Sequence, residues 1–313
     1  MRVLVFGGTG TIGRAVVAEL VARGHVTTCF TRRPAQIPGA SVRQGDVTET
    51  ADLDAVFRDA AYGAVISCLA SRTGAPDDAW AIDHDAHLQI LAAAKAAAVG
   101  HIVLLSAICV QKPLLAFQRA KLAFEDALIA SGLRYSIVRP TAFFKSLSGQ
   151  VERVRAGKSF LVFGDGRLTA CKPISDGDLA DYIAGCLEQP ARWNRVLPIG
   201  GPGPALTPQE QGAALAKALG VAPRYRHVPV ALLSAIIGIL SVVGYLSPAL
   251  RAKADLARIG RYYATESMLV LDPATGRYDA RATPEHGQDT LPAFYARLAA
   301  GETAPDRGDH AVF

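Results

Sequence analysis

Short runs of apolar, β-branched residues alternate with alanine-rich stretches of helical periodicity along the first 140 residues. The runs are apolar throughout, which is typical of strands that are covered on both faces. This β-then-α unit repeats six times, and the repeat predicts the α/β class with a Rossmann-type, doubly wound parallel sheet. The predicted strands are 2–6, 26–31, a short strand near Val42, 64–67, 101–106 and 135–139, and one long helix is predicted over 79–98.

The rhythm changes after Pro140, where the predicted elements become shorter. We expect strands at 160–163 and 196–199, and helices at 178–188, 208–219 and 291–299. Open α/β sheets bind ligands at the carboxyl ends of their strands, so this smaller C-terminal region is expected to cover a substrate there. We therefore divide the chain into a Rossmann domain over 1–140, a substrate-binding or lid region over 141–300 that interleaves with the last sheet elements, and a loose tail over 301–313.

One segment, 228–250, contains no charged residue. Within 224–261, which includes this segment, six basic residues accompany a single acid, so this stretch holds the whole net charge of +5. The segment is long enough to span a bilayer, but prolines, glycines and serines interrupt it. Three interpretations stay open, in this order of preference: an apolar lid or a peripheral membrane contact, a buried core helix, and a membrane span.

Composition excludes several classes of protein. Half of the residues are hydrophobic and 19% are charged, which excludes a disordered chain, and the mild net charge gives no reason to expect nucleic-acid binding. The five cysteines are widely spaced without a CxxC pair, and the seven histidines form no metal-ligand pattern. The strand-like run from residue 2 leaves no room for a signal peptide. We expect a protein of the reducing cytoplasm that holds no metal of its own.

A glycine-rich loop follows the first predicted strand directly. Its glycines permit a tight turn, a close approach of the backbone to a pyrophosphate, and close packing of helix and strand. The amides at the start of the following helix, at the positive end of its dipole, then bind the anion. An ordinary glycine-rich turn is the alternative. The predicted dinucleotide site consists of Gly7, Thr9, Gly10, Thr11, Ile12 and Gly13.

Two arginines, Arg32 and Arg33, follow the second predicted strand, where an enzyme specific for NAD usually carries an acid. Their guanidinium groups match a 2′-phosphate in charge and geometry, so we predict NADPH as the cofactor. A pair of solvated arginines is the alternative. Asp46, after the third strand, is expected near the adenine, and a helix-capping or turn aspartate is equally open.

These motifs and the strand order resemble the short-chain dehydrogenase/reductase superfamily, in its atypical branch close to NmrA-like proteins. The resemblance implies catalytic roles for Ser106, after the fifth strand, and for Lys121 of a Tyr-x-x-x-Lys pair, with Lys121 also binding the cofactor ribose. Phe117 stands at the tyrosine position, and a benzyl ring cannot protonate an alkoxide. Hydride addition to an alkene conjugated with a large π-system needs no such acid. A surface lysine and a structural serine are the alternatives.

Two long segments within 102–166 read SAICVQKPLLAFQRAK and SIVRPTAFFKSLSGQ. They are similar to the NADPH-dependent 3,8-divinyl (proto)chlorophyllide 8-vinyl reductases of chlorophyll and bacteriochlorophyll synthesis, and the similarity covers most of the chain. The resemblance implies reduction of an 8-vinyl group to ethyl with NADPH as hydride source, and it makes Phe117 part of the family motif. The plant members carry a transit region that is absent here, which favours a bacterial form in the cytoplasm.

The resemblance also implies a tetrapyrrole that brings its own magnesium and lies at the loops after the fifth and sixth strands. We expect Phe143 and Phe144 to stack on or edge the macrocycle, and Lys112 or Lys145 to meet its propionate. Core phenylalanines and solvated lysines are the alternative. Two other functions stay open: a non-catalytic NADP(H)-binding sensor or assembly factor of the NmrA-like type, and an NADPH-dependent reductase of a quinone-like substrate.

Overall fold

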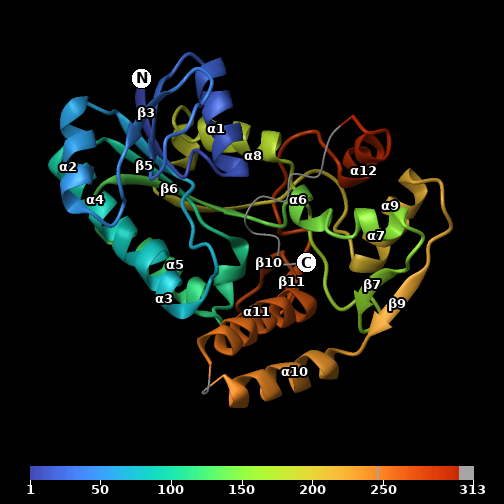
Figure 1. Ribbon diagram of the computed structural model, residues 1–313. Helices are drawn as coiled ribbons and strands as arrows, with labels where there is room; N and C mark the ends of the chain where they lie inside the picture. Colours follow the sequence, from blue (N-terminus) through green and yellow to red (C-terminus); the bar gives the residue numbers. More distant parts are fainter. Residues whose placement is uncertain (245–246, 303–313) are drawn as a thin grey trace. The chain divides into compact units, whose positions relative to one another are not determined.

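The computed structural model describes residues 1–244 and 247–302 and divides into two compact units (Figure 1). The first unit contains Met1–Arg72, Pro76–Pro140 and Asp176–Pro198. The second contains Thr73–Ala75, Thr141–Ser175 and the chain from Ile199 onward. The chain thus leaves the first unit after Pro140 and returns to it before the last strand of the sheet. Most of the tail predicted over 301–313 lies outside the described residues.

A seven-stranded sheet with the order β3-β2-β1-β4-β5-β6-β8 forms the centre of the first unit. Each neighbouring pair from β3 to β6 is parallel. This is the strand order of a doubly wound dinucleotide-binding fold, so the predicted fold class is confirmed. The strands are β1 (Arg2–Phe6), β2 (Val26–Thr31), β3 (Ser41–Gln44), β4 (Ala64–Ser67), β5 (His101–Leu105), β6 (Arg134–Pro140) and β8 (Arg195–Ile199).

Helices flank this sheet in two groups (Figure 1). The first group pairs α1 with α8, and in the second α4 packs against both α2 and α5. Arg23, just after α1, forms ion pairs with Glu19, Asp181 and Glu188, and the last two pairs join α1 to the region of α8. The helices are α1 (Thr11–Ala22), α2 (Thr50–Asp59), α3 (Pro76–Ala79), α4 (His87–Ala96), α5 (Ala116–Ala130) and α8 (Asp176–Gly185), with 3-10 turns at Ile108–Gln111 and Pro190–Arg192.

The central strands are apolar because helices cover both faces of the sheet. Four of the five residues of β1 and all four of β4 are buried, as expected where helices cover both faces of a parallel sheet. Side chains such as Phe6, Val65 and Ile102 share one core cluster with Leu53 of α2 and Phe124 of α5. Strand β3, by contrast, lies at the edge of the sheet and has no buried residue.

The helix predicted over 79–98 is interrupted. After α3 the chain forms a π-helix over Trp80–Ala86 and only then the regular helix α4. A π-helix has a wider turn than an α-helix and occurs often at functional sites. Apolar periodicity cannot distinguish the two, so the sequence predicted a single regular helix.

The second unit consists of short elements around a smaller core. Strands β7 (Phe160–Phe163) and β9 (Tyr225–Val228) pair in parallel, and β10 (Val270–Leu271) pairs with β11 (Tyr278–Asp279) in antiparallel fashion. Its core includes Phe144, Val151, Leu215 and Tyr295, and the Tyr295 hydroxyl donates to the Leu147 carbonyl. Its helices are α6 (Phe144–Leu147), α7 (Val151–Arg155), α9 (Pro208–Ala218), α10 (Val230–Val243), α11 (Pro248–Thr265) and α12 (Leu291–Ala299).

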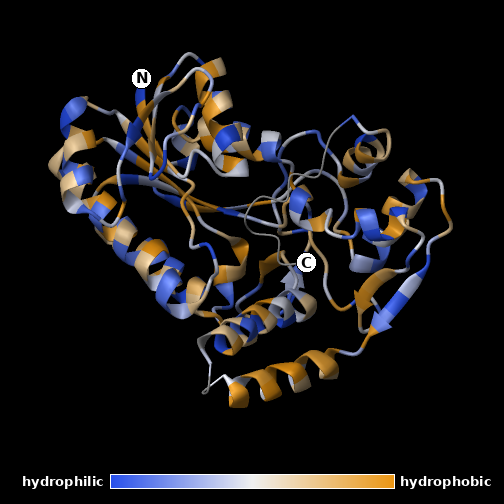
Figure 2. Ribbon diagram, viewed as in Figure 1, coloured by the Kyte–Doolittle hydropathy of each residue, from blue (hydrophilic) through white to orange (hydrophobic). Residues whose placement is uncertain are grey.

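The uncharged segment 228–250 contains helix α10 and the first residues of α11. Helix α10 has no buried residue, so the interpretation as a core helix is wrong. Within the described part of the chain, no helix has both the length and the apolar character that crossing a membrane requires. Figure 2 shows α10 as hydrophobic along its whole length, whereas α11 mixes hydrophobic and hydrophilic residues.

Candidate functional site

The glycine loop joins β1 to α1 by a close approach of backbone to backbone. Gly7 has φ +75°, and a Cβ atom there would lie 2.6 Å from the Cys68 carbonyl group. A Cβ on Gly13 would lie 2.1 Å from the Gly7 carbonyl oxygen, whereas one on Gly10 would lie at an ordinary 3.5 Å from the same atom. Only glycine therefore fits at Gly7 and Gly13, and the loop has the tight form that a dinucleotide site requires.

Helix α1 begins in this loop without a side-chain cap. Gly10 is the N-cap residue and has no side chain to accept from the first turn. The first amides of an α-helix have no partner within the helix, so those of Thr11, Ile12 and Gly13 are available to an anion. The Arg14 Nε donates to the Thr9 carbonyl over 2.9 Å and thereby fixes Thr9, the residue before the N-cap. The six predicted loop residues thus lie in one tight turn at the uncapped start of α1, and their role toward a dinucleotide stays a prediction.

The two arginines after β2 are both exposed, and the structure places Arg32 close to Asp46. The Asp46 carboxylate accepts from the amide and the hydroxyl of Thr48 at 2.9 and 2.7 Å. These hydrogen bonds, together with the nearby Arg32 charge, lower the pKa of the Asp46 carboxyl. The contacts of Asp46 are those of a turn residue, the alternative that the sequence left open, and its role toward adenine stays a prediction.

Lys121 is buried on α5 and forms an ion pair with Asp83 of the π-helix, with 2.9 Å between Nζ and Oδ1. The Ser71 amide donates to the same oxygen over 3.1 Å. Burial alone would raise the pKa of the Asp83 carboxyl, but the Lys121 ammonium and the bonds from Ser71 outweigh it and lower that pKa. The other oxygen, Oδ2, is buried without a partner. Lys121 is therefore no solvated surface lysine, because it is held by a buried carboxylate.

His87, the first residue of α4, belongs to the same buried region. Burial, reinforced by the Lys121 charge, lowers its pKa to about 4, so the imidazole is neutral at neutral pH. Its Nδ1 lies 2.8 Å from the Ile82 carbonyl oxygen and therefore carries the proton. Its Nε2 then accepts from the Ser67 hydroxyl, also over 2.8 Å. These bonds join the end of β4 to the turn that carries Asp83.

Ser106, just after β5, donates its hydroxyl proton to the Glu125 carboxylate of α5 over 2.5 Å. Glu125 is 1% exposed and is in turn paired with Arg139 of β6, whose Nε lies 3.2 and 3.1 Å from its two oxygens. Because the only hydroxyl proton of Ser106 is committed to Glu125, the serine can accept a hydrogen bond but cannot donate one. Phe117, at the first turn of α5, is 8% exposed.

The predicted substrate residues fall in different surroundings. Lys112, in the first unit, and Phe143 and Lys145, in the second, are half-buried. Phe144 is 3% exposed and packs against Phe294 in a tilted arrangement, with 5.2 Å between the ring centroids. The placement of Phe144 agrees with the core alternative, because a side chain so buried has no free face for a macrocycle.

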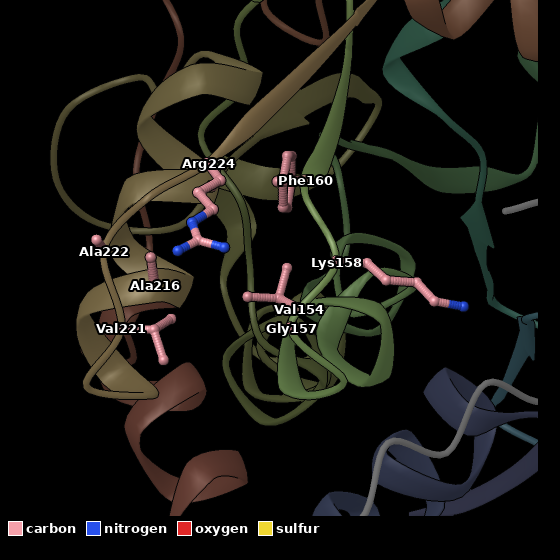
Figure 3. Close-up of a pocket in the computed structure, with 9 residues that line it drawn as sticks. Val154, Gly157, Lys158, Phe160, Ala216, Val221, Ala222 and Arg224 are labelled. Atoms are coloured by element: carbon pink, nitrogen blue, oxygen red, sulfur yellow. The ribbon is translucent and has the colours of Figure 1, made fainter.

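A hollow of about 240 Å³ lies within the second unit (Figure 3). Its lining includes Val154, Phe160 and Val221, with Arg224 reaching among them and Lys158 extending away. No predicted site residue lines it, and no pair of polar groups converges in it. We therefore keep the candidate site with the polar groups of the first unit.

Sequence reasoning missed the acids and the arginine that hold the predicted site residues. The sequence alone does not single out Asp83, Glu125 or Arg139. Their importance becomes visible only in the structure, where each forms an ion pair with a residue of another element. A local signal did exist for Glu125, since it lies one helical turn after Lys121 on the same side of α5. Within residues 1–244 and 247–302, no group of three or more His, Cys, Asp and Glu side chains could hold a metal ion.

Comparisons with known proteins identify the family of this chain. A family model described as NAD(P)H-binding matches residues 7–190. The chloroplastic divinyl chlorophyllide a 8-vinyl-reductase of Arabidopsis thaliana is 48% identical over 319 residues, which cover 95% of this chain and 76% of the relative. The protein of the same name from Cucumis sativus is 47% identical, covering 100% of this chain and 80% of that one. The solved structure of MoeE5 with UDP-glucose and NAD has a TM-score of 0.70 at 18% identity, over 96% of this chain and 98% of its own, and so shares the fold.

The glycine loop gives a prediction on stability. Gly13→Ala forces a Cβ atom against the Gly7 carbonyl and should lower the free energy of unfolding by about 1–3 kcal/mol, the usual cost of overpacking. Gly10→Ala is the matched control, because its Cβ makes an ordinary contact, and it should change that free energy by less than about 0.5 kcal/mol. Urea unfolding without added cofactor measures both. Equal losses would contradict the geometry of the loop.

The ion pair on α5 gives a second prediction. Asp83→Asn leaves the buried Lys121 ammonium unpaired and should lower the free energy of unfolding by about 3–5 kcal/mol. Asp85→Asn, on the same π-helix, removes a 63% exposed carboxylate and should cost less than about 1 kcal/mol. The folded pKa of Asp83 is lowered, so its stabilising contribution is present at neutral pH and is lost as the pH falls below the ordinary carboxyl value. Unfolding followed between neutral and acidic pH tests both statements, and similar losses in the two variants would argue against the pair.

Proposed function

Because this chain belongs to the divinyl chlorophyllide a 8-vinyl-reductase family, we propose that it reduces the 8-vinyl group of a 3,8-divinyl chlorophyllide or protochlorophyllide a to ethyl, with NADPH as the reductant. The vinyl group takes up one hydride and one proton, and NADPH becomes NADP⁺. The chain is thus an NAD(P)H-dependent oxidoreductase that acts on a carbon–carbon double bond. The observation that carries the proposal is the 48% identity over 95% of the chain.

The residues around Lys121 support a reduction without an acid at an oxygen. Phe117 takes the place of a phenol, and the Ser106 hydroxyl has committed its proton to Glu125. In a conjugated vinyl group the macrocycle disperses the charge that follows hydride addition, so positioning is the main demand on the protein. The rigid ion pairs of Lys121 and Glu125 suit that demand, and the proton can come from water.

The first unit fits a nicotinamide dinucleotide. The close approach of Gly13 to Gly7 and the uncapped start of α1 form a cradle that a side chain would fill. We assign the pyrophosphate to this loop, the ribose hydroxyls to Lys121, and the 2′-phosphate of NADPH to Arg32 and Arg33. When bound there, NADPH supplies the hydride.

The substrate assignment rests on the family and on side-chain exposure. Lys112, Phe143 and Lys145 keep exposed surface. We assign one edge of the macrocycle to Phe143, and the propionate to either Lys112 or Lys145. Phe144 serves the core of the second unit. The magnesium belongs to the chlorin and enters with it. We also assign to segment 228–250 a peripheral contact with a membrane from which such an apolar substrate would be drawn.

The direct test is a turnover assay with purified protein, NADPH and 3,8-divinyl chlorophyllide a, followed by chromatography. We expect the 8-ethyl product in proportion to the NADPH consumed. Lys121→Ala should lower turnover or NADPH affinity at least about tenfold, as expected for the loss of one charge-assisted contact. Lys95→Ala, an exposed lysine on α4, is the matched control and should leave both unchanged.

Three outcomes of this assay would argue for other functions. Bound NADPH without an 8-ethyl product would favour a sensor or an assembly factor. Rapid consumption of NADPH with a quinone, and none with the chlorophyllide, would favour a quinone reductase. An undiminished Lys121→Ala enzyme would show that the cofactor lies elsewhere.

The choice between NADPH and NADH can be tested on the arginines alone. Replacing Arg32 and Arg33 by alanine should raise the KM for NADPH at least about tenfold, because the 2′-phosphate loses its counter-charges. The KM for NADH, which has no such phosphate, should change little. Arg43→Ala is the control, since Arg43 is an exposed arginine on β3 that pairs with Asp59. An equal rise in the KM for both cofactors would contradict the assignment of the 2′-phosphate to these arginines.

A further inference from the structure

Helix α10 differs from every other long helix of the chain in its relation to solvent. It contains fourteen residues, VALLSAIIGILSVV, none of them charged and none of them buried. A helix that is hydrophobic all round is normally found inside a protein or in a membrane. Its presence at the surface means that residues 1–244 and 247–302 supply no apolar partner that encloses it.

Two stripes of side chains run along α10. The inner stripe, which includes Leu233, Ile237 and Ser241, is half-buried, and the Ser241 hydroxyl accepts from Arg258 of α11 over 2.7 Å. The outer stripe points to solvent, and its exposed fractions reach 65% at Ile239 and 71% at Val242. Helix α11 therefore covers one side of α10 only. The outer stripe consists of Leu232, Ile236, Ile239, Val242 and Val243.

Basic residues flank α10 on both sides in the chain. Arg224 and Arg226 precede α10, and Arg251, Lys253 and Arg261 lie on α11, all five of them exposed. The sixth basic residue, Arg258, is paired with Asp255, the only acid between 224 and 261. A second copy of this chain would bring the same excess of positive charge and would be repelled. An anionic surface complements it.

The length of α10 decides how it can meet a bilayer. Fourteen residues at about 1.5 Å each give about 21 Å, which is short of the roughly 30 Å hydrocarbon core. Such a helix can lie in the plane of the interface with its apolar side among the acyl chains and basic residues at the headgroups.

We propose that α10 is an in-plane membrane anchor that binds anionic lipid bilayers through its outer stripe, with the exposed basic residues of β9 and α11 at the headgroups. The anchor does not depend on the reductase reaction, since it needs neither NADPH nor the chlorin. It places the second unit at the surface where apolar, anionic molecules are concentrated.

Vesicle flotation without cofactor or substrate tests the anchor. The full chain should bind vesicles of phosphatidylcholine mixed with phosphatidylglycerol, bind phosphatidylcholine alone more weakly, and be released by alkaline carbonate. Ile239→Asp with Val242→Asp should abolish binding to both. Arg251→Gln with Lys253→Gln should weaken binding to the anionic vesicles roughly 30-fold, at about fivefold per basic side chain, and leave the neutral vesicles unaffected. Ile129→Asp, at an exposed apolar residue of α5, is the matched control and should bind as the parent does.

Several results would overturn the proposal. One is a folded parent protein, with its normal thermal midpoint, that does not bind anionic vesicles. Another is an Ile239/Val242 variant that binds as well as the parent. A parent dimer that this variant dissociates would identify a second copy as the partner of the outer stripe. If the Ile239/Val242 variant has a higher KM for divinyl chlorophyllide than the parent in vesicle-free solution, while its vesicle binding is unchanged, α10 is a lid. The first three of these results do not depend on whether the reductase assay succeeds.

Discussion

Two buried charges on one helix constrain the rest of the first unit. Lys121 and Glu125 lie one turn apart on α5, with opposite sign and almost no contact with water. A buried ion without a partner costs several kcal/mol, so each must be met by a charge from another element. Asp83 of the π-helix meets Lys121, and Arg139 of β6 meets Glu125. The positions of α5, β6 and the segment after β4 are therefore fixed by electrostatics as well as by apolar packing.

These pairs also decide what the site can do. Ser106 follows β5 and is bonded to Glu125, so the carboxyl ends of neighbouring strands are connected to α5 by polar contacts. The contacts fix the side chains in place. They provide no hydroxyl that could protonate a substrate, because Ser106 donates its proton to Glu125 and Phe117 stands where a tyrosine would be. A site of this kind is suited to holding a hydride donor and an acceptor in register, and it is poorly suited to protonating an alkoxide.

Local patterns predicted the elements well and their partners poorly. The strand at 2–6, the strand at 26–31 and the last helix at 291–299 lie where the apolar pattern put them, since each is determined by its own residues. The ion pairs could not be predicted in this way. Asp83 and Asp85 stand two residues apart and look alike in the sequence, yet the Asp83 side chain is wholly buried and that of Asp85 is 63% exposed. Their burial differs because of the turn of a π-helix and a lysine nearly forty residues away. The pattern of apolar and polar positions predicts neither.

The two units depart from ordinary solvation in opposite ways. In the first, charged side chains are inside, and the partner of each is another side chain of the same chain. In the second, apolar side chains of α10 are outside, and the described part of the chain supplies a partner for only one of their two stripes. Gly244 and Pro248, near the end of α10 and the start of α11, are typical of helix boundaries, so the sequence itself favours a short surface helix over a continuous span. A fold that pairs the buried charges of Lys121 and Glu125 has no evident reason to leave one helix unmatched, unless the match for that helix lies outside the protein.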